Sequence, residues 1–332
     1  MAKRINLFDQ DVYDKHVNED NKLLLEDYVM ELKSRGLAEK TIYQYTSDIR
    51  AFYCYLYENV KNAYILELKK RDFRRFFLKM SDNGTSSARI NRFQSSIRNM
   101  LEYAVEDDDE YDYEINAMAS IKGIKGEKVR EITFLTDEQI DIILNYLLER
   151  ELYEQALYLS LSYDSAARRN EVLQVEKNDF VKNNMTNEVI GKRGKKFKLF
   201  YFDRTKKIAE KYLKQRGEDN EKSMWVVGKG SNVVPRSYES FYSWVVNFRK
   251  ILLEETGEVV NLNPHSFRHS ALTNYENGTH SSLVYFGKKN LGIDVLKVLA
   301  NHDSIDTTQS YLPDKDEELL MGALGLLGGT NE

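Results

Sequence analysis

Apolar residues recur three or four positions apart through the first hundred residues, which is the spacing of amphipathic helices. The pattern occupies four stretches, at residues 25–32, 42–56, 73–77 and 90–101. Turn-forming residues interrupt it at 34–36 and at 81–84, each ending in a glycine. These features predict a small bundle of four helices.

From residue 134 onward the pattern is again mainly helical, with one exception. Thr136 and Gln139 have the spacing of a capping box, before an apolar helical stripe that runs to Leu147. Around residues 189–201 the apolar period changes to two, on either side of a stretch rich in Gly and Lys, which predicts a β-hairpin with a basic turn. Further helices are predicted at 154–163, from 168 onward, and near 204–216, 237–255, 264–276 and 293–300. The expected fold class is mainly α, with a small antiparallel sheet in the second part.

The composition is that of a globular protein with two domains. The chain has 332 residues, of which 42% are hydrophobic and 30% are charged, and only 3 are Pro. No apolar run approaches the roughly 18 residues of a membrane span, and the first residues lack the apolar stretch of a signal peptide. The single cysteine, Cys54, cannot form a disulfide within the chain. We therefore expect a water-soluble protein of the cytoplasm with no membrane partner.

Charge is distributed unevenly along the chain, and this changes what the net charge of −5 implies. Taken whole, an acidic balance argues mildly against a nucleic-acid partner. Residues 21–105, however, carry 15 Lys or Arg against 10 Asp or Glu, whereas residues 106–114 contain seven acids and no base. The first part is locally basic, and the acidic run is expected to be a solvated linker. A solvated polar face is the simpler explanation of the basic residues at this stage.

Two local patterns have residue types that could hold a phosphate. Residues 263–264, Asn-Pro, mark a helix start, after which His265 and Arg268 lie three positions apart on one face, near N–H groups that favour an anion. Arg168 and Glu171 repeat this spacing. Each pattern taken alone has an ordinary explanation: a surface pair formed by chance, or an intrahelical ion pair of a few tenths of a kcal/mol.

The order of the candidate residues along the chain points to one family. They are Arg168, Lys192 in a glycine-flanked turn, His265-x-x-Arg268, His302 and Tyr311. The chain resembles the tyrosine site-specific recombinases, the phage-integrase family, whose catalytic domain presents Arg, Lys, His-x-x-Arg, His and a nucleophilic Tyr in this order. Residues 165–173 stand where that family has Thr-Gly-x-Arg-x-x-Glu-Leu, and residues 301–311 are similar to its Gly-His-x-x-x-x-Thr-Thr-x-x-Tyr. Residues 36–45 and 90–92 resemble its core-binding domain, so the resemblance covers about residues 22–313.

The resemblance implies DNA strand cleavage and rejoining through a 3′-phosphotyrosine, which keeps the phosphodiester energy without a cofactor or a metal. The roles it implies are Tyr311 as nucleophile, Arg168 and Arg268 as cations on the phosphoryl oxygens, Lys192 as the acid that protonates the departing 5′ oxygen, His265 as base or hydrogen-bond donor, His302 as a hydrogen-bond partner of a phosphoryl oxygen, and Glu171 as the residue that orients its neighbours.

The resemblance also implies a domain organisation and partners. We expect an N-terminal extension (1–20), a SAM-like helical core-binding domain (21–105), the acidic linker (106–130), a mixed α/β catalytic-type domain (131–313) and a C-terminal tail (314–332). The two domains would close on double-stranded DNA. The candidate DNA contacts of the first domain are Lys40, Thr41, Arg71, Arg74, Arg75, Arg89, Arg92 and Arg98. In this family such tails dock on a neighbouring protomer, which implies self-association on DNA; packing of the tail on its own domain is the alternative.

Three departures from the family pattern leave two functions open. Ser165-Ala166 replaces Thr-Gly, and Ala300-Asn301 replaces Leu-Gly. His302 follows Arg268 by 34 positions, which is about ten more than usual and indicates a loop insertion near 281–291. The first hypothesis is an active recombinase, a phage or mobile-element integrase. The second is a DNA-binding regulator, such as a repressor, that keeps the fold and has stopped cutting.

Overall fold

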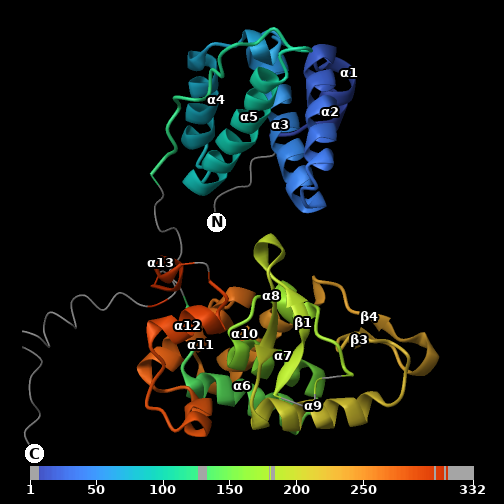
Figure 1. Ribbon diagram of the computed structural model, residues 1–332, viewed down its shortest axis with the longest axis vertical. Helices are drawn as coiled ribbons and strands as arrows, with labels where there is room; N and C mark the ends of the chain where they lie inside the picture. The colour runs from blue at the N-terminus through green and yellow to red at the C-terminus, as the bar shows by residue number, and fades with distance from the viewer. Residues whose placement is uncertain are drawn as a thin grey trace, which may run out of the picture. The chain divides into compact units, whose positions relative to one another are not determined.

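The chain forms two compact units, Met1–Glu131 and Ile132–Glu332. The computed structural model describes residues 7–125, 133–178, 180, 184–302, 304–309 and 312, and Figure 1 shows the helices and strands of each unit. Within these residues, none of the helices combines the length and the apolar character that crossing a membrane requires.

The first unit is a helical bundle. Its helices are α1 (Gln10–His16), α2 (Glu19–Ser34), α3 (Glu39–Asn59), α4 (Lys70–Asp82) and α5 (Ser87–Glu106), with a short 3-10 turn, η1 (Ile65–Glu67). The four predicted helices are α2 to α5, and Gly36 and Gly84 follow α2 and α4 with left-handed φ angles of 68° and 74°. Helix α1 lies inside the predicted N-terminal extension, residues 1–20. It begins at Asp9, whose side chain accepts a hydrogen bond from the Val12 amide, and it buries Tyr13 in the bundle.

The segment that follows α5 differs from the solvated linker expected at 106–130. Tyr111, Met118 and Ile121 are buried in the core of the first unit. Arg98 on α5 donates hydrogen bonds to the main-chain carbonyls of Met118 and Ile121. The physical reason is that the aromatic residues among the acids and the apolar residues after them gain free energy when the core of the unit removes them from water.

The second unit is built around a buried helix. It contains α6 (Asp137–Glu149), α7 (Tyr153–Ser165), α8 (Arg169–Leu173), α9 (Asp203–Arg216), α10 (Ser240–Thr256), α11 (Pro264–Asn277), α12 (Ile293–Leu299) and α13 (Ile305–Gln309). Helix α7 is buried along nearly its whole length and packs against α6, α9 and α11. The predicted capping box is present, since the Gln139 amide donates to Thr136 Oγ1 (3.2 Å) and the Thr136 amide donates to Gln139 Oε1 (3.1 Å).

The predicted hairpin is formed by β1 (Met185–Ile190) and β2 (Lys196–Phe200), which pair antiparallel with Val189 opposite Phe197. Its turn contains a 3-10 segment, η2 (Lys192–Gly194). A second short pair, β3 (Val226–Val227) with β4 (Val234–Pro235), flanks η3 (Gly230–Asn232) and was not predicted. The expectation of a mainly helical protein with a small antiparallel sheet is confirmed.

A loop insertion is predicted near 281–291, but the segment is not an open loop. It starts as a 3-10 helix, η4 (Ser281–Phe286), and both Leu283 and Leu291 are buried. His280, directly before η4, is stacked between the rings of Tyr163 and Tyr275, with centroid distances of 4.1 and 3.8 Å. These apolar and aromatic residues anchor the segment on α7 and α11, which a count of inserted residues could not reveal.

Candidate functional site

Arg168 lies at the start of α8, where Glu171 fixes both its main chain and its side chain. One carboxylate oxygen of Glu171 accepts from the Arg168 amide (2.7 Å) and the other accepts from Arg168 Nη1 (2.9 Å). The side chain of Glu171 is only 2% exposed, whereas that of Arg168 is 24% exposed. The guanidinium is therefore oriented from one side and still reaches solvent.

Arg268 is a fully buried guanidinium on α11 that is held mainly by main-chain carbonyls. Its Nη1 donates to Ala166 O and its Nη2 to Ala300 O, both at 2.6 Å. Burial of a cation costs several kcal/mol unless hydrogen bonds satisfy it, and these two carbonyls supply such bonds. Nη2 also lies in hydrogen-bond contact with His302 Nε2. Arg268 thus joins the turn before Arg168 to the turn before His302.

His302 is buried and has a defined orientation. Because the Arg268 guanidinium only donates, His302 Nε2 is its acceptor, which leaves the proton on Nδ1, 2.9 Å from Thr308 Oγ1. Asn301 precedes it with a left-handed φ of 51°, at the position where the family motif has Gly. Thr308 belongs to the motif at residues 301–311, but no linear pattern predicts its contact with His302.

The hairpin that carries Lys192 is docked closely against these residues. Lys192 itself is exposed in η2. At Gly191, an added Cβ would lie 2.8 Å from Phe197 Cε1, and 3.3 Å from both Asn301 Nδ2 and Glu171 Oε1. Only glycine permits this approach, so α8, the hairpin and the His302 turn meet at Gly191.

His265 lies at the N-terminus of α11. Asn263 caps the helix by accepting from the His265 amide (2.9 Å), as the sequence predicts. Part of the residue is exposed, but desolvation of the ring lowers its pKa below 6.5, and the positive charges of Arg268, Arg168 and Arg169 lower it further. His265 is therefore neutral near pH 7 and able to accept a proton.

Two of the predicted features lie outside the described residues: Tyr311 and the C-terminal tail, 314–332. The described chain brings Arg168, Glu171, Arg268 and His302 together, with His265 in electrostatic contact with both arginines. In this part of the chain, no group of three His, Cys, Asp or Glu side chains is arranged to hold a metal ion.

The candidate DNA contacts of the first unit fall into two groups. Arg71, Arg74 and Arg75 are exposed on α4, Lys40 is exposed and Thr41 half-buried at the start of α3, and Arg89 is half-buried on α5. Arg92 instead forms a two-point ion pair with the buried carboxylate of Asp48 (2.8 and 2.9 Å) and stays 41% exposed. Arg98 donates to main-chain carbonyls of the following segment, and a DNA contact there stays a prediction.

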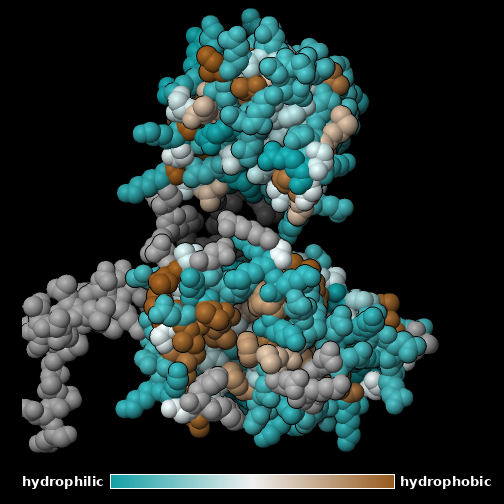
Figure 2. All heavy atoms as spheres, viewed as in Figure 1, coloured by the Kyte–Doolittle hydropathy of each residue, from teal (hydrophilic) through white to brown (hydrophobic). Residues whose placement is uncertain are grey.

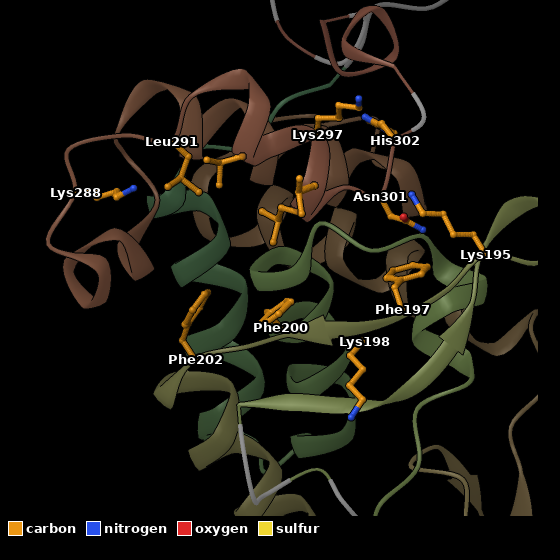
Figure 3. Close-up of a pocket in the computed structure, with 13 residues that line it drawn as sticks. Lys195, Phe197, Lys198, Phe200, Phe202, Lys288, Leu291, Lys297, Asn301 and His302 are labelled. Atoms are coloured by element: carbon orange, nitrogen blue, oxygen red, sulfur yellow. The ribbon is translucent and has the colours of Figure 1, made fainter.

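An apolar groove of about 760 Å³ lies beside His302, between β2 and α12 (Figure 3). Its wall is formed by phenyl rings and valines, and four lysines line it as well: Phe197, Phe200, Phe202, Val295 and Val298, with Lys195, Lys198, Lys288 and Lys297. Lys195 and Lys297 stand on either side of Asn301 and His302 (Figure 3). Hydrophobic surface also gathers near α12 on this face of the second unit (Figure 2).

Comparisons with known proteins place the chain in a family. Residues 133–318 match the phage integrase family, and residues 25–108 match the phage integrase N-terminal SAM-like domain. Tyrosine recombinase XerC of Treponema denticola is 29% identical over 297 residues, which is 86% of this chain and 92% of the relative. The SPbeta prophage-derived recombinase-like protein YomM of Bacillus subtilis is 25% identical, over 92% of this chain and 90% of its own length.

Solved structures show the same fold. A lambda integrase dimer bound to a COC′ core site aligns with a TM-score of 0.67 at 17% identity, over 92% of this chain and 85% of its own. The Tn1549 transposon integrase in complex with transposon right end DNA aligns with a TM-score of 0.66 at 14% identity, over 91% of this chain and 99% of its own. Since the family match alone covers more than half of the sequence, the chain belongs to the phage integrase family, the tyrosine recombinases.

Proposed function

We propose that this protein is a site-specific DNA recombinase that cuts and rejoins strands through a covalent bond between DNA and Tyr311. Membership of the family and the recombinase relatives support the enzyme class. The observation that carries the mechanism is the buried centre in which Arg268 joins Ala166, Ala300 and His302. A fixed cation beside an oriented imidazole suits a phosphoryl group whose oxygens gain charge during transfer.

The proposed chemical step exchanges one phosphate ester for another. The Tyr311 oxygen attacks phosphorus and forms a P–O bond, while the bond between phosphorus and the 5′ oxygen breaks. The tyrosine proton passes to a base, for which the neutral ring of His265 is suited. Lys192 gives a proton to the leaving 5′ oxygen. The product is a 3′-phosphotyrosine and a free 5′-hydroxyl, and attack by another 5′-hydroxyl reverses the step without an external energy source.

Arg168 and Arg268 supply the positive charge for the phosphoryl oxygens in this proposal, and His302 holds Arg268 through its Nε2. Glu171 holds Arg168 from the side opposite to solvent, which leaves part of the guanidinium for the ligand. The fork geometry of Arg suits two phosphoryl oxygens at once. DNA contacts outside the site are assigned to the first unit, chiefly to the exposed Arg71, Arg74 and Arg75 of α4.

The alternative of an inactive DNA-binding regulator is not favoured. Its main support was the inserted segment near 281–291, which could have covered the site. The first residues of this segment bind Asp137 and Asp164, and His280 directly before it stacks on Tyr163 and Tyr275. Arg168 keeps its exposure to solvent. The relative from Treponema denticola is named a tyrosine recombinase, and YomM is named a recombinase-like protein.

The decisive experiment traps the covalent intermediate. A DNA duplex nicked next to the cleavage point loses the short 5′-hydroxyl fragment after attack, so the phosphotyrosine accumulates. Wild type should form an adduct that survives denaturation, and Tyr311→Phe should form none while binding the same duplex. Tyr242→Phe, on the exposed surface of α10, is the matched control and should behave as wild type. Tight binding without an adduct in wild type would contradict the proposal.

The proposal also includes self-association: the C-terminal tail of one copy docks in the apolar groove beside His302 of another copy. The groove is apolar and bears four lysines, and the tail contains Asp314, Asp316, Glu317 and Glu318 before Leu319 and Leu320. Acids beside apolar residues complement lysines beside phenyl rings in both charge and polarity.

The docking is tested by DNA binding on one and on two half-sites. Deletion of residues 314–332, and Val298→Asp at an exposed valine of the groove, should each abolish cooperative binding to two half-sites and leave binding to a single half-site unchanged. Val259→Asp, exposed outside the groove, is the control. If the deletion instead lowers the thermal stability of the monomer and leaves cooperativity intact, the tail packs on its own unit.

A further inference from the structure

Asp164 is a fully buried carboxylate in the last turn of α7, four residues before Arg168. It is given no role by the motifs or by the mechanism above. An ionised carboxylate is costly to bury unless several donors satisfy it. Desolvation raises its pKa, and Arg204 together with hydrogen bonds from Thr205, Phe202 and Ser282 opposes that shift.

The donors to Asp164 come from segments that are distant in sequence. Oδ2 accepts from Thr205 Oγ1 (2.5 Å) at the start of α9 and from the Phe202 amide (3.1 Å) after β2. Oδ1 accepts from Ser282 Oγ (3.3 Å) in η4 and lies 3.8 Å from Arg204 Nη2. The carboxylate therefore ties the end of α7 to the exit of the hairpin, to α9 and to the inserted segment.

The main chain at Asp164 leads directly into the site. Its carbonyl accepts from the Tyr275 hydroxyl of α11 (2.8 Å). The turn that follows contains Ala166 with a left-handed φ of 50°, and the Ala166 carbonyl accepts from Arg268 Nη1. A non-glycine residue in this conformation costs about 1 kcal/mol and needs its surroundings to hold it there. Arg168 follows two residues later, so the turn sets the position of both arginines.

We propose that Asp164 is a positioning residue for the phosphate-binding arginines: its carboxylate fixes the end of α7 so that the Ala166 turn orients Arg268 and places Arg168. The inference rests on the proposed function, because it takes these arginines to bind the scissile phosphate. It also assigns a structural role to the inserted segment near 281–291, since Ser282 in η4 is one of the donors to Asp164. The insertion thus supports the site and does not obstruct it.

The experiment separates positioning from mere stability by changing the charge of the substrate. A methylphosphonate at the cleavage point replaces one charged oxygen with a neutral methyl group, which reduces the need for correctly placed guanidinium groups. The readout is the rate of single-turnover cleavage on the methylphosphonate divided by the rate on the phosphate. A fold that is only less stable lowers both rates together and leaves this ratio unchanged.

The variants are Asp164→Asn and Ser282→Ala, each in the full chain. Asp164→Asn should raise the ratio about tenfold or more, with DNA affinity changed by less than about threefold. Ser282→Ala removes a single donor and should raise the ratio in the same direction by a smaller factor, which keeps the test valid if Asp164→Asn fails to fold. Asp219→Asn is the matched control, because this carboxylate is buried in the same unit but binds Arg216 and Lys177.

Arg168→Ala makes the two possible failures distinguishable. If Arg168→Ala raises the ratio and both Asp164→Asn and Ser282→Ala leave it at the wild-type value, Asp164 is only structural and the inference is wrong. If Arg168→Ala itself leaves the ratio unchanged, the arginine does not bind the phosphate charge and the proposed function is wrong at that residue. An equal rise in Asp219→Asn would also overturn the inference, because it would attribute the effect to loss of stability.

Discussion

Arg268, the buried cation of the site, is held by main-chain atoms more than by other side chains. Arg268 depends on the carbonyls of Ala166 and Ala300, and both of these carbonyls belong to turns that contain a left-handed residue, Ala166 itself and Asn301. The family resemblance places glycine at both positions. The non-glycine residues can keep the conformation because the buried guanidinium binds each turn. The site and its unusual backbone therefore stabilise each other.

The first prediction concerns the charge state of His265. Burial of the ring and the nearby Arg268 and Arg168 lower its pKa below the ordinary value of about 6.5. A base with a lowered pKa stays neutral, and active, as the pH falls through 6.5, and loses activity only below that. NMR titration of the free protein should give an imidazole midpoint below 6.5, assigned by His265→Gln, and Arg168→Ala should shift the midpoint upward. A midpoint at or above 6.5 in wild type would contradict this account.

His280 leads to a prediction about acid stability. Its ring is buried between Tyr163 and Tyr275, and desolvation lowers its pKa to about 3. Below pH 6.5 the unfolded chain binds a proton at this residue that the folded chain does not, so stability is lost as the pH falls from about 6.5 towards 3. The slope from one such proton is about 1.4 kcal/mol per pH unit. His280→Phe keeps a ring in the stack, and its free energy of unfolding should decline less steeply over this range than that of wild type. Equal slopes in the two proteins would show that His280 does not titrate in this way.

At the scale of elements, the hairpin, α8 and the turn after α12 meet at Gly191. Because an added Cβ would lie 2.8 Å from the Phe197 ring of the hairpin and 3.3 Å from Glu171 and Asn301, Gly191→Ala must displace that ring and shift the hairpin turn away from Glu171 and Asn301. Lys192 would move with it. We expect a loss of stability of about 1–3 kcal/mol and a larger loss of cleavage rate than of DNA affinity.

The chemical readout for Gly191→Ala is a substrate with a sulfur in place of the 5′ bridging oxygen. A thiolate leaves without needing a proton, so a defect in placing Lys192 should be largely rescued on this substrate. Gly292→Ala, at a site with open space around the added Cβ and an ordinary φ of −68°, is the control and should match wild type. Equal defects on both substrates would mean that the glycine serves folding alone.

The elements themselves show which parts of the fold a sequence can predict. Helices α2 to α5 and the capping box of α6 were predicted because a continuous apolar stripe or a local hydrogen bond defines them. Helix α1 was missed because it buries little besides Tyr13. The segments at 107–125 and 281–286 have no period of their own, and their structure comes from contacts with residues far along the chain.

The site was predictable in its residues but not in its contacts. The linear order of Arg168, Lys192, His265, Arg268 and His302 identified the family, and the matches confirm it. No linear pattern showed that Arg268 would bind two carbonyls or that Thr308 would bind His302. Nor did one show that the buried Asp164 carboxylate would bind residues of α9 and η4 just before the Ala166 turn. These contacts join elements that only the tertiary fold brings together.

At the scale of the whole molecule, the sequence alone likewise does not show which charged residues can reach a ligand. The net charge of −5 conceals a basic first part, and a count of its Arg residues overstates the cations that can meet DNA. Among the eight candidates, Arg92 pairs with the buried Asp48 and Arg98 holds the segment after α5. Which basic residues face a ligand follows from the fold and not from the sequence.

The last prediction uses this distinction to test how the molecule binds DNA. Each phosphate contact releases counterions, so removing one should reduce the slope of log affinity against log salt by about 1. Arg74→Ala, at an exposed position on α4, should weaken binding, reduce the slope by this amount and leave the free energy of unfolding within about 0.5 kcal/mol of wild type.

Arg98→Ala should lower stability and leave the salt slope as in wild type. It removes hydrogen bonds to Met118 and Ile121, which costs about 1–3 kcal/mol of stability. Titrations at several salt concentrations, paired with denaturant unfolding, measure both quantities. If Arg98→Ala flattens the slope and Arg74→Ala does not, DNA lies against α5 and the assignment of α4 as the DNA-facing helix is wrong.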